Sequence, residues 1–298
     1  MPALYEPSGE SVLRCMVAEW PSNQFFNLAF EEAFYRVLPR LGWGACLRFW
    51  RNDRVVVIGR FQCAVLEVNA LEARRLGVKL VRRFTGGGAV YHDGGNLNYA
   101  LALLRSVSPV KDMKEAFRFL GEAVADALGS LGVKDATYRP LNDIEVRGMK
   151  VSGLAASAGR KALFVHGAML VSSDFGALWR VLKIPKEKLV DKKFVQSRRK
   201  RVTTLEEELG RSVGMEEVMK AIVDVVSEKL GLKPKWIPPT QPETSEARRL
   251  YNEKYCRVEW NLKYLDHVRS HLSPEELEAL LEIARPPETT RQEVVGPE

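Results

Sequence analysis

Cysteine is scarce in this sequence, and its four residues are far apart: Cys15, Cys46, Cys63 and Cys256, with no CxxC pair among them. Disulfide-stabilised secreted domains and structural zinc sites both need cysteines at closer and more regular spacing. The sequence therefore argues against a disulfide framework and against a cysteine-bound metal. We interpret the four side chains as small, partly buried hydrophobic groups.

Long apolar runs are also absent: no stretch reaches the length of about 20 residues that a membrane-spanning helix requires. Residues 1–7 lack the basic-then-apolar pattern of a secretory signal. The chain has 298 residues, 46% of them hydrophobic, which is typical of a globular protein with one large domain, or one large and one small. We expect a cytoplasmic protein.

Positively charged residues outnumber negatively charged ones, which gives a net charge of +7 and a pI near 9.2. A basic surface steers anionic partners by long-range attraction, which admits nucleic acid, nucleotides and acidic protein domains. A nucleic-acid-binding protein is one hypothesis, and it rests on this charge and on the basic run at 197–201. That run lacks the interleaved aromatic residues that would stack on bases, so a solvated loop is the favoured interpretation.

The hydrophobic pattern predicts helices and strands in alternation. Helices are expected at 22–38, with Ser22 as the cap, and at 71–76, 111–131, 215–230, 244–255 and 274–283. Strands are expected at 48–58, 79–81, 98–104, 144–146, 150–151 and 163–171. Because a hairpin at 144–151 stands among interleaved helices and strands, the pattern favours an α+β fold, a mixed β-sheet flanked by helices.

Two segments have little apolar periodicity. Residues 234–243 contain four prolines and are the best candidate for a linker. The tail at 285–298 is polar and contains proline, so we expect it to be frayed.

The strongest local signal is the run Arg-Arg-Phe-Thr-Gly-Gly-Gly-Ala-Val-Tyr-His-Asp at 82–93. Consecutive glycines after a strand let the backbone approach a ligand closely, and exposed N–H groups there form an anion-binding concavity. The arginines before them suit phosphate or carboxylate oxygens. No Gly-Lys-Ser/Thr closes the loop and no helix follows, so this is neither a P-loop nor a dinucleotide-binding turn.

The second signal is the hairpin segment at 141–155, which carries Lys150 shortly before a Ser-Gly pair. A lysine on a hairpin arm can project its ammonium into a neighbouring loop. At a phosphoryl centre such a cation neutralises the negative charge that develops during the reaction. On its own, Lys150 would be read as a surface lysine of a strand, and the glycine run changes that interpretation.

Together the two segments resemble the lipoate-protein ligase family, within the biotin and lipoate ligase superfamily. Further matches follow in family order over roughly residues 10–262, at 26–32, 56–62, 67–69, 164–170, 201–205 and 254–261. The resemblance implies a fold related to the catalytic domains of class II aminoacyl-tRNA synthetases. It also implies a two-step reaction that uses ATP and Mg²⁺: lipoate forms lipoyl-AMP, and the lipoyl group then passes to a lysine of an acceptor.

Position by position, the resemblance also implies roles for individual residues. Lys150 is expected to be catalytic and to contact both the α-phosphate region and the lipoyl carboxyl. The nucleotide is expected to contact Arg83, Gly86, Gly87, Gly88, Ala89, Val90, Tyr91, Asn142, Asp143 and Lys150. The substrate pocket is expected to include His92, His166, Arg82, Gly153 and Ala155, although either histidine could equally be a satisfied core residue. No protein metal ligands are expected.

The expected partners are acidic lipoyl domains of the 2-oxoacid dehydrogenase E2 type or the glycine cleavage H protein type. Residues 1–262 would form the catalytic domain, and residues 263–298 only a helix and a polar tail. Full-length ligases of this family continue here into an accessory domain. We therefore expect a separate small polypeptide to complete the enzyme.

Two enzyme alternatives stay open. Octanoyl or lipoyl transferases of the superfamily use no ATP and form a thioester on a cysteine, which in the most similar relatives lies shortly before the lysine hairpin. Residues 139–143 contain no cysteine; Cys63 directly follows the motif at 56–62, and Cys256 lies within the motif at 254–261. A biotin ligase fits the glycine run less well than a lipoate ligase does.

Overall fold

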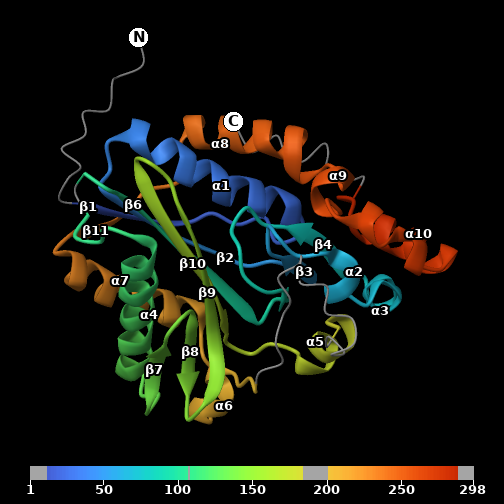
Figure 1. Ribbon diagram of the computed structural model, residues 1–298. Coiled ribbons are helices and arrows are strands. Elements are labelled where there is room, and N and C mark those ends of the chain that lie inside the picture. The colour runs from blue at the N-terminus through green and yellow to red at the C-terminus, as the bar shows by residue number, and fades with distance from the viewer. Residues whose placement is uncertain (1–11, 107, 184–200, 288–298) are drawn as a thin grey trace.

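A mixed β-sheet forms the centre of the protein, whose computed structural model describes residues 12–106, 108–183 and 201–287 (Figure 1). Its eight strands have the order β11-β1-β2-β6-β10-β9-β8-β7. The pairs of β1 with β11 and β2 are parallel, and the others are antiparallel. The strands are β1 (Val12–Val17), β2 (Ala45–Trp50), β6 (Asn96–Leu104), β7 (Ala136–Arg139), β8 (Asp143–Val146), β9 (Met149–Ala158), β10 (Ala162–Leu170) and β11 (Lys233–Trp236).

Helices cover both faces of this sheet, as Figure 1 shows. On one face α1 (Gln24–Leu41) packs along α8 (Gln241–Leu250), and aromatic residues fill the space beneath them. On the other face lie α4 (Met113–Ser130) and α7 (Met215–Leu230), over a second core of mainly aliphatic residues. The expectation of an α+β fold with a mixed sheet flanked by helices is confirmed.

A second, smaller sheet stands beside the first. It has the order β4-β3-β5, from β4 (Lys79–Arg82), β3 (Val55–Ile58) and β5 (Val90–His92). Its own apolar cluster joins it to four helices: α2 (Ala64–Glu67), α3 (Ala70–Arg75), α5 (Phe175–Val181) and α10 (Pro274–Ile283). The glycine run connects β4 to β5, and it lies on the side of the small sheet that faces the large sheet.

Several of the predicted elements have different bounds in the structure, and two of these differences change the interpretation. The first helix begins at Gln24, and Asn23 rather than Ser22 caps it by accepting from the N–H of Phe26 at 3.0 Å. The strand predicted at 48–58 is two strands, β2 and β3, which belong to different sheets. The polar residues at 51–54 form the turn between them, and periodicity alone does not reveal such a change of sheet.

The predicted linker at 234–243 is wrong. Residues 233–236 are strand β11, and Gln241 begins α8, where Glu243 completes a capping box with Thr240. Glu243 is buried and forms an ion pair of 2.6 Å with Arg14, which is fully buried on β1. Prolines are tolerated here because β11 is the outer strand of the sheet and Pro242 lies in the first turn of a helix.

The C-terminal part of the described chain packs on the smaller sheet unit. Helix α10 begins at Pro274, as predicted, with Ser273 forming a capping box, and it lies against α3. Leu280 and Ile283 are buried there, so the apolar stripe of this helix is covered by its own chain. The remaining helical turns in the described chain are α6 (Leu205–Leu209), the π-helix at Tyr251–Tyr255, α9 (Val258–Asn261) and the 3-10 turns at Leu265–His267 and Arg269–His271.

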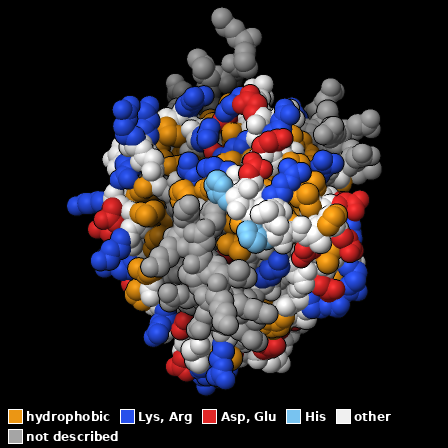
Figure 2. Space-filling view, turned by 45° about the vertical axis from the view of Figure 1, so that its right-hand side comes forward, with side chains coloured by type: hydrophobic (Ala, Val, Ile, Leu, Met, Phe, Trp, Pro, Cys, Tyr) orange, Lys and Arg blue, Asp and Glu red, His pale blue; other side chains and the backbone are white. Residues whose placement is uncertain are grey.

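Helices within the described ranges are too short or too polar to span a bilayer. Most of the basic run at 197–201 and the end of the tail, 288–298, lie outside those ranges. On the face seen in Figure 2, Lys and Arg side chains are interspersed with Asp and Glu rather than gathered into one basic surface.

The Arg14–Glu243 pair should dominate the stability that α8 contributes. Changing Glu243→Gln leaves a buried guanidinium without its counter-charge, so we expect unfolding to become easier by about 3 kcal/mol. The control is Glu246→Gln, because Glu246 pairs with the largely exposed Arg249 and such a pair contributes about 1 kcal/mol or less. Denaturant unfolding of both variants provides the comparison, and equal losses would contradict the assignment.

Candidate functional site

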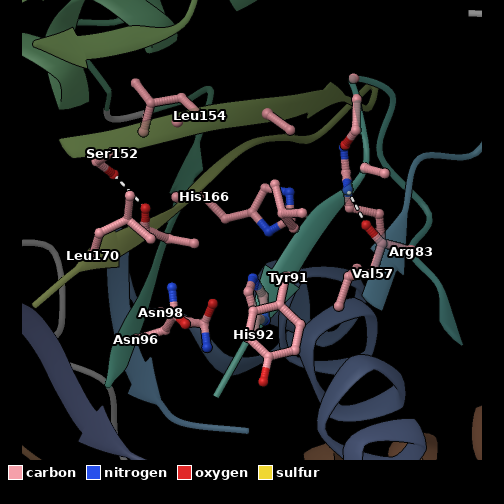
Figure 3. Close-up of a pocket in the computed structure, with 18 of the residues that line it drawn as sticks. Val57, Arg83, Tyr91, His92, Asn96, Asn98, Ser152, Leu154, His166 and Leu170 are labelled. Atoms are coloured by element: carbon pink, nitrogen blue, oxygen red, sulfur yellow. Dashed lines mark hydrogen bonds between the residues drawn. The ribbon is translucent and has the colours of Figure 1, made fainter. Parts of the chain in front are cut away.

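A cavity of about 640 Å³ lies between the two sheets. Its wall comes from α1, from β3 and β5 of the small sheet, and from β6, β9 and β10 of the large sheet (Figure 3). One part of the wall is apolar, with Val57, Leu154, Leu170 and Leu178 among its residues. The glycine run and the lysine hairpin line the same space, so the two strongest sequence signals meet here.

We call residues 83–89 the glycine loop. Its backbone passes close to the backbone at the end of β3. Gly87 has φ +90°, and a Cβ there would lie 2.8 Å from a guanidinium nitrogen of Arg83. A Cβ on Gly59 would overlap the carbonyl of Gly87. Both positions therefore need glycine, one for its left-handed backbone and one for the close approach of two main chains.

Arg83 braces this loop from behind. Its buried guanidinium donates to the carbonyls of Gly86 (2.6 Å) and Gly88 (2.8 Å), and to the hydroxyl of Thr85 (3.1 Å). In a trans peptide the C=O and the N–H point in opposite directions. The Gly86 carbonyl points to the Arg83 guanidinium, so the Gly87 N–H of the same peptide points away from it. Burial lowers the pKa of Arg83 to about 10, so the side chain stays a cation near neutral pH.

Of the predicted nucleotide contacts, Arg83, Gly87, Gly88, Ala89, Val90, Tyr91, Asn142, Asp143 and Lys150 line the cavity. Gly86 is not among the lining residues, and its carbonyl accepts from Arg83. Of the predicted substrate-pocket residues, His92, His166, Gly153 and Ala155 line the cavity, and Arg82 does not. Arg82 follows the strand alternation: it points to the opposite side from Arg83 and is fully buried there.

Lys150 lies at the start of β9, next to Asp143 on β8. Its ammonium forms an ion pair of 2.8 Å with the Asp143 carboxylate. A Cβ on Gly153 would overlap the end of the Lys150 side chain, so the glycine of the Ser-Gly pair provides the space that the ammonium occupies. Burial, with a contribution from the nearby Arg83 charge, lowers the pKa of Lys150 to about 8.

The main chain of Lys150 is held as well. Its N–H donates to the carbonyl of Arg201 at 2.8 Å, and its carbonyl accepts from the N–H of Thr203 at 3.0 Å. These bonds add residues 201–203 to the edge of the hairpin and bring Val202 into the cavity wall. The lysine is therefore fixed by backbone on one side and by a carboxylate on the other.

His166 links helix α1 to the glycine loop. Its Nδ1 lies 2.6 Å from a carboxylate oxygen of Glu31, and its Nε2 lies 2.8 Å from the Thr85 hydroxyl. Since Thr85 also accepts from Arg83, a continuous line of hydrogen bonds runs from α1 to the loop. His166 thus both lines the cavity and braces it.

His92 presents a different picture. Asn27 donates to the Oδ1 of Asn52 at 2.8 Å, which turns the Nδ2 of Asn52 toward His92 Nδ1 at 3.1 Å. His92 Nδ1 therefore accepts, and the proton of the ring sits on Nε2. Burial lowers the pKa of His92 to about 3, so the ring is neutral. Nε2 is buried without a protein partner among the described residues, which leaves a donor at the cavity wall.

Several lining residues were missed by reasoning from single positions: Glu31, Trp50, Asn52 and Asn98. Glu31 lies in the family motif at 26–32, but the motif did not indicate what this residue does. Asn52 lies in a turn, and the sequence around it indicates no role, because its function depends on contacts with Asn27 and His92.

The chemistry available is that of an anion site beside an apolar wall. Arg83 and Lys150 supply positive charge, and the Lys150 amine is paired with one carboxylate. Cysteine does not occur among the lining residues in the part of the chain that is described, and burial raises the pKa of Cys63. No group of three or more His, Cys, Asp or Glu in those residues could hold a metal ion.

Comparison with known proteins gives a family match. The family model for the lipoyl protein ligase A/B catalytic domain matches residues 23–227. The chain is 38% identical over 262 residues to lipoate-protein ligase A subunit 1 of Thermoplasma acidophilum, covering 85% of this chain and 97% of that one. It is 36% identical over 190 residues to a protein of Mycoplasma pneumoniae named probable lipoate-protein ligase A, covering 63% of this chain and 55% of that one.

Solved structures give the same match. A bipartite lipoate protein ligase of T. acidophilum, studied with its E2 lipoyl domain, has a TM-score of 0.74 at 38% identity, over 84% of this chain and 96% of that one. A T. acidophilum ligase with bound lipoic acid has a TM-score of 0.72 at 34% identity, covering 84% and 99%. A lipoate-protein ligase A bound with ATP has a TM-score of 0.71 at 33% identity, covering 84% and 98%.

The depressed pKa of Lys150 can be measured directly. Because burial disfavours the ammonium, its neutral amine should appear as pH rises through about 8 rather than the ordinary 10.5. The rate at which a small amine-acylating reagent labels Lys150, followed by peptide mass spectrometry, should therefore reach half its maximum near pH 8. The same lysine in urea-unfolded chain is the control, and identical midpoints in the two states would refute the shift.

Proposed function

This chain belongs to the lipoyl protein ligase A/B catalytic-domain family, and from that membership and the cavity we propose that it is an ATP-dependent lipoate-protein ligase. It would form lipoyl-AMP and transfer the lipoyl group to a lysine of an acceptor lipoyl domain. The observation that carries the proposal is the meeting of two cations, Arg83 and Lys150, with a braced glycine loop at one apolar-walled cavity. Relatives solved with lipoic acid and with ATP support both substrates.

In the first step a carboxylate oxygen of lipoate attacks the α-phosphorus of ATP, and the bond to the β-phosphate breaks to release pyrophosphate. Negative charge builds on the phosphoryl oxygens as this happens. Fixed donors and cations that are already in place stabilise such charge without reorganising. Lys150 suits this task because its ammonium is held by Asp143 and its main chain by residues 201–203.

In the second step the neutral amine of an acceptor lysine attacks the carbonyl of lipoyl-AMP. The carbon–oxygen bond to AMP breaks, the amide forms and one proton leaves the amine. AMP is a good leaving group, so no nucleophile of the protein is needed. That proton passes to solvent water, because Lys150 enters this step as the ammonium held by Asp143.

Magnesium is part of the proposal through the nucleotide. The cavity wall offers the carboxylate of Asp143 beside Lys150 and that of Glu31, which is paired with His166, and described residues form no three-ligand cluster. Mg²⁺ in nucleotide sites is commonly bound by one or two carboxylates together with substrate phosphates and water. This donor set fits an ion that arrives with ATP.

Partners are proposed from the relatives. The T. acidophilum ligase is bipartite and was studied with its E2 lipoyl domain, and this chain covers 96% of the matched ligase chain. We propose a lipoyl domain as acceptor and a separate small polypeptide as a second subunit. A net charge of +7 favours an acidic acceptor through electrostatic steering.

A thioester-forming transferase is the alternative activity, and the cavity favours the ligase. Burial raises the pKa of Cys15 and Cys46 to about 12, as well as that of Cys63, so these thiols are protonated near neutral pH. A thiolate is the form that attacks an acyl group.

The position of the Lys150 ammonium should decide the rate of the first step. In assays that include the small subunit, we expect Lys150→Ala to slow lipoate-dependent pyrophosphate release by about a hundredfold or more. Gly153→Ala should also slow it by at least about tenfold, because the new methyl group occupies the space of the ammonium. The matched control is Gly129→Ala on α4, where a Cβ meets open space, and this variant should keep full activity.

Thermal unfolding of each variant shows whether the fold is intact. Pyrophosphate release near the wild-type rate in folded Lys150→Ala would sink the assignment of this lysine. Normal activity in Gly153→Ala would show that the ammonium does not act from the place where it lies.

The two steps should also differ in their need for a second subunit. We expect the chain alone to transfer the lipoyl group from supplied lipoyl-AMP to a lipoyl domain, because this step needs only the bound intermediate. We expect it to make little lipoyl-AMP from ATP and lipoate until the small subunit is added. Robust formation of lipoyl-AMP by the purified chain alone would contradict the two-component proposal.

A further inference from the structure

Arg82 is fully buried, and its guanidinium donates to main-chain carbonyls of two segments far apart in the sequence. One segment is the turn at 59–62, where Arg82 reaches Gly59 at 2.9 Å and Gln62 at 2.6 Å. The other is α9, where it reaches Trp260 at 2.9 Å and Asn261 at 3.0 Å. The planar fork of an arginine can hold several acceptors in fixed directions, which a lysine cannot do.

The α9 segment returns these bonds to the backbone of β4. The indole N–H of Trp260 donates to the carbonyl of Arg82 at 2.8 Å. The side-chain oxygen of Asn261 accepts from the N–H of Arg82 at 3.0 Å. Asn261 is itself buried and donates to the carbonyls of Tyr255 and Ala284, so α9 is fixed to the helices around it. The last residue of β4 is thus held through both its side chain and its main chain.

The turn at 59–62 also supports the glycine loop through main-chain hydrogen bonds. The N–H of Arg60 donates to the carbonyl of Thr85 at 2.8 Å, and the N–H of Arg83 donates to the carbonyl of Ile58 at 3.0 Å. The backbone of Gly59 lies so close to Gly87 that no side chain fits between them. A displacement of this turn would therefore move the glycine loop with it.

We propose that Arg82, Trp260 and Asn261 form a clamp whose task is to position the glycine loop for the nucleotide. Helix α9 lies some 170 residues after the glycine loop in the sequence. Through the clamp it would contribute to the first reaction step. These residues are positioning residues, since Arg82 does not line the cavity. The proposal rests on the proposed function only for the identity of the ligand, because the effect on the loop itself exists without any ligand.

Trp260→Phe is the sharpest variant, because it removes the N–H donor and keeps an aromatic ring beside Lys254 and Tyr255. Hydrogen exchange followed by mass spectrometry, without ligand, should become at least about fivefold faster in peptides that cover residues 83–91. Arg82→Lys is the second variant, since it keeps the positive charge but cannot reach both segments. The matched control is Trp236→Phe on the edge strand β11, which should leave exchange in these peptides unchanged.

Kinetics then separate positioning from general damage. In Trp260→Phe the KM for ATP should rise by about fivefold or more, which is the scale of one lost hydrogen bond with a buried partner. The KM for lipoate should stay within about twofold. A merely destabilising substitution would lower the amount of active enzyme and leave both KM values unchanged.

The outcomes are distinct. Faster exchange at 83–91 with a raised KM for ATP in Trp260→Phe supports the clamp, and a larger effect in Arg82→Lys strengthens it. Wild-type exchange and wild-type KM for ATP in folded Trp260→Phe overturn it, as does an equal change in Trp236→Phe. If one clamp variant does not fold, the other decides the question. If the wild-type protein forms no lipoyl-AMP even with its small subunit added, the proposed function fails, while the exchange result still decides whether the clamp holds the loop.

Discussion

The geometry of the cavity depends on the buried guanidinium of Arg83. A buried cation must find acceptors, and here the carbonyls of Gly86 and Gly88 provide them. This requirement holds the glycine loop in one conformation before any ligand arrives. His166 and Thr85 extend the same hydrogen-bonded line to α1. A site prepared in this way can stabilise charge at a reacting phosphate without reorganising, which is what adenylate formation requires.

Much of the site could be predicted because its parts are local in the sequence. The glycine run and the lysine hairpin each carry their chemistry in a few adjacent residues, and the structure brings both to one cavity. The roles of the two adjacent arginines were harder to separate. Consecutive side chains of a strand point to opposite sides, so only one of Arg82 and Arg83 can face the cavity. Alternation alone does not say which of the two it is; the fold shows that Arg83 lines the cavity and Arg82 is buried elsewhere.

Other features could not be predicted, because they depend on contacts between distant segments. The proline-containing stretch at 234–243 has the composition of a linker, yet Glu243 is fixed by Arg14, 229 residues away. Asn52 directs His92 only because Asn27 orients its amide. Neither pairing leaves a periodic pattern in the sequence. In both cases a buried polar group determines the local structure, and its partner is visible only in the fold.

The central claim is that lipoate attacks the α-phosphorus of ATP in this cavity, and oxygen labelling tests it most directly. Lipoate with ¹⁸O in both carboxyl positions is incubated with ATP, the enzyme, the proposed small subunit and a lipoyl domain, and the mass of the released AMP is measured by mass spectrometry. Attack by the carboxylate leaves one labelled oxygen on AMP after the acyl group has moved to lysine. The account predicts AMP heavier by a single ¹⁸O. Unlabelled AMP, or lipoylation that forms no AMP, would contradict it.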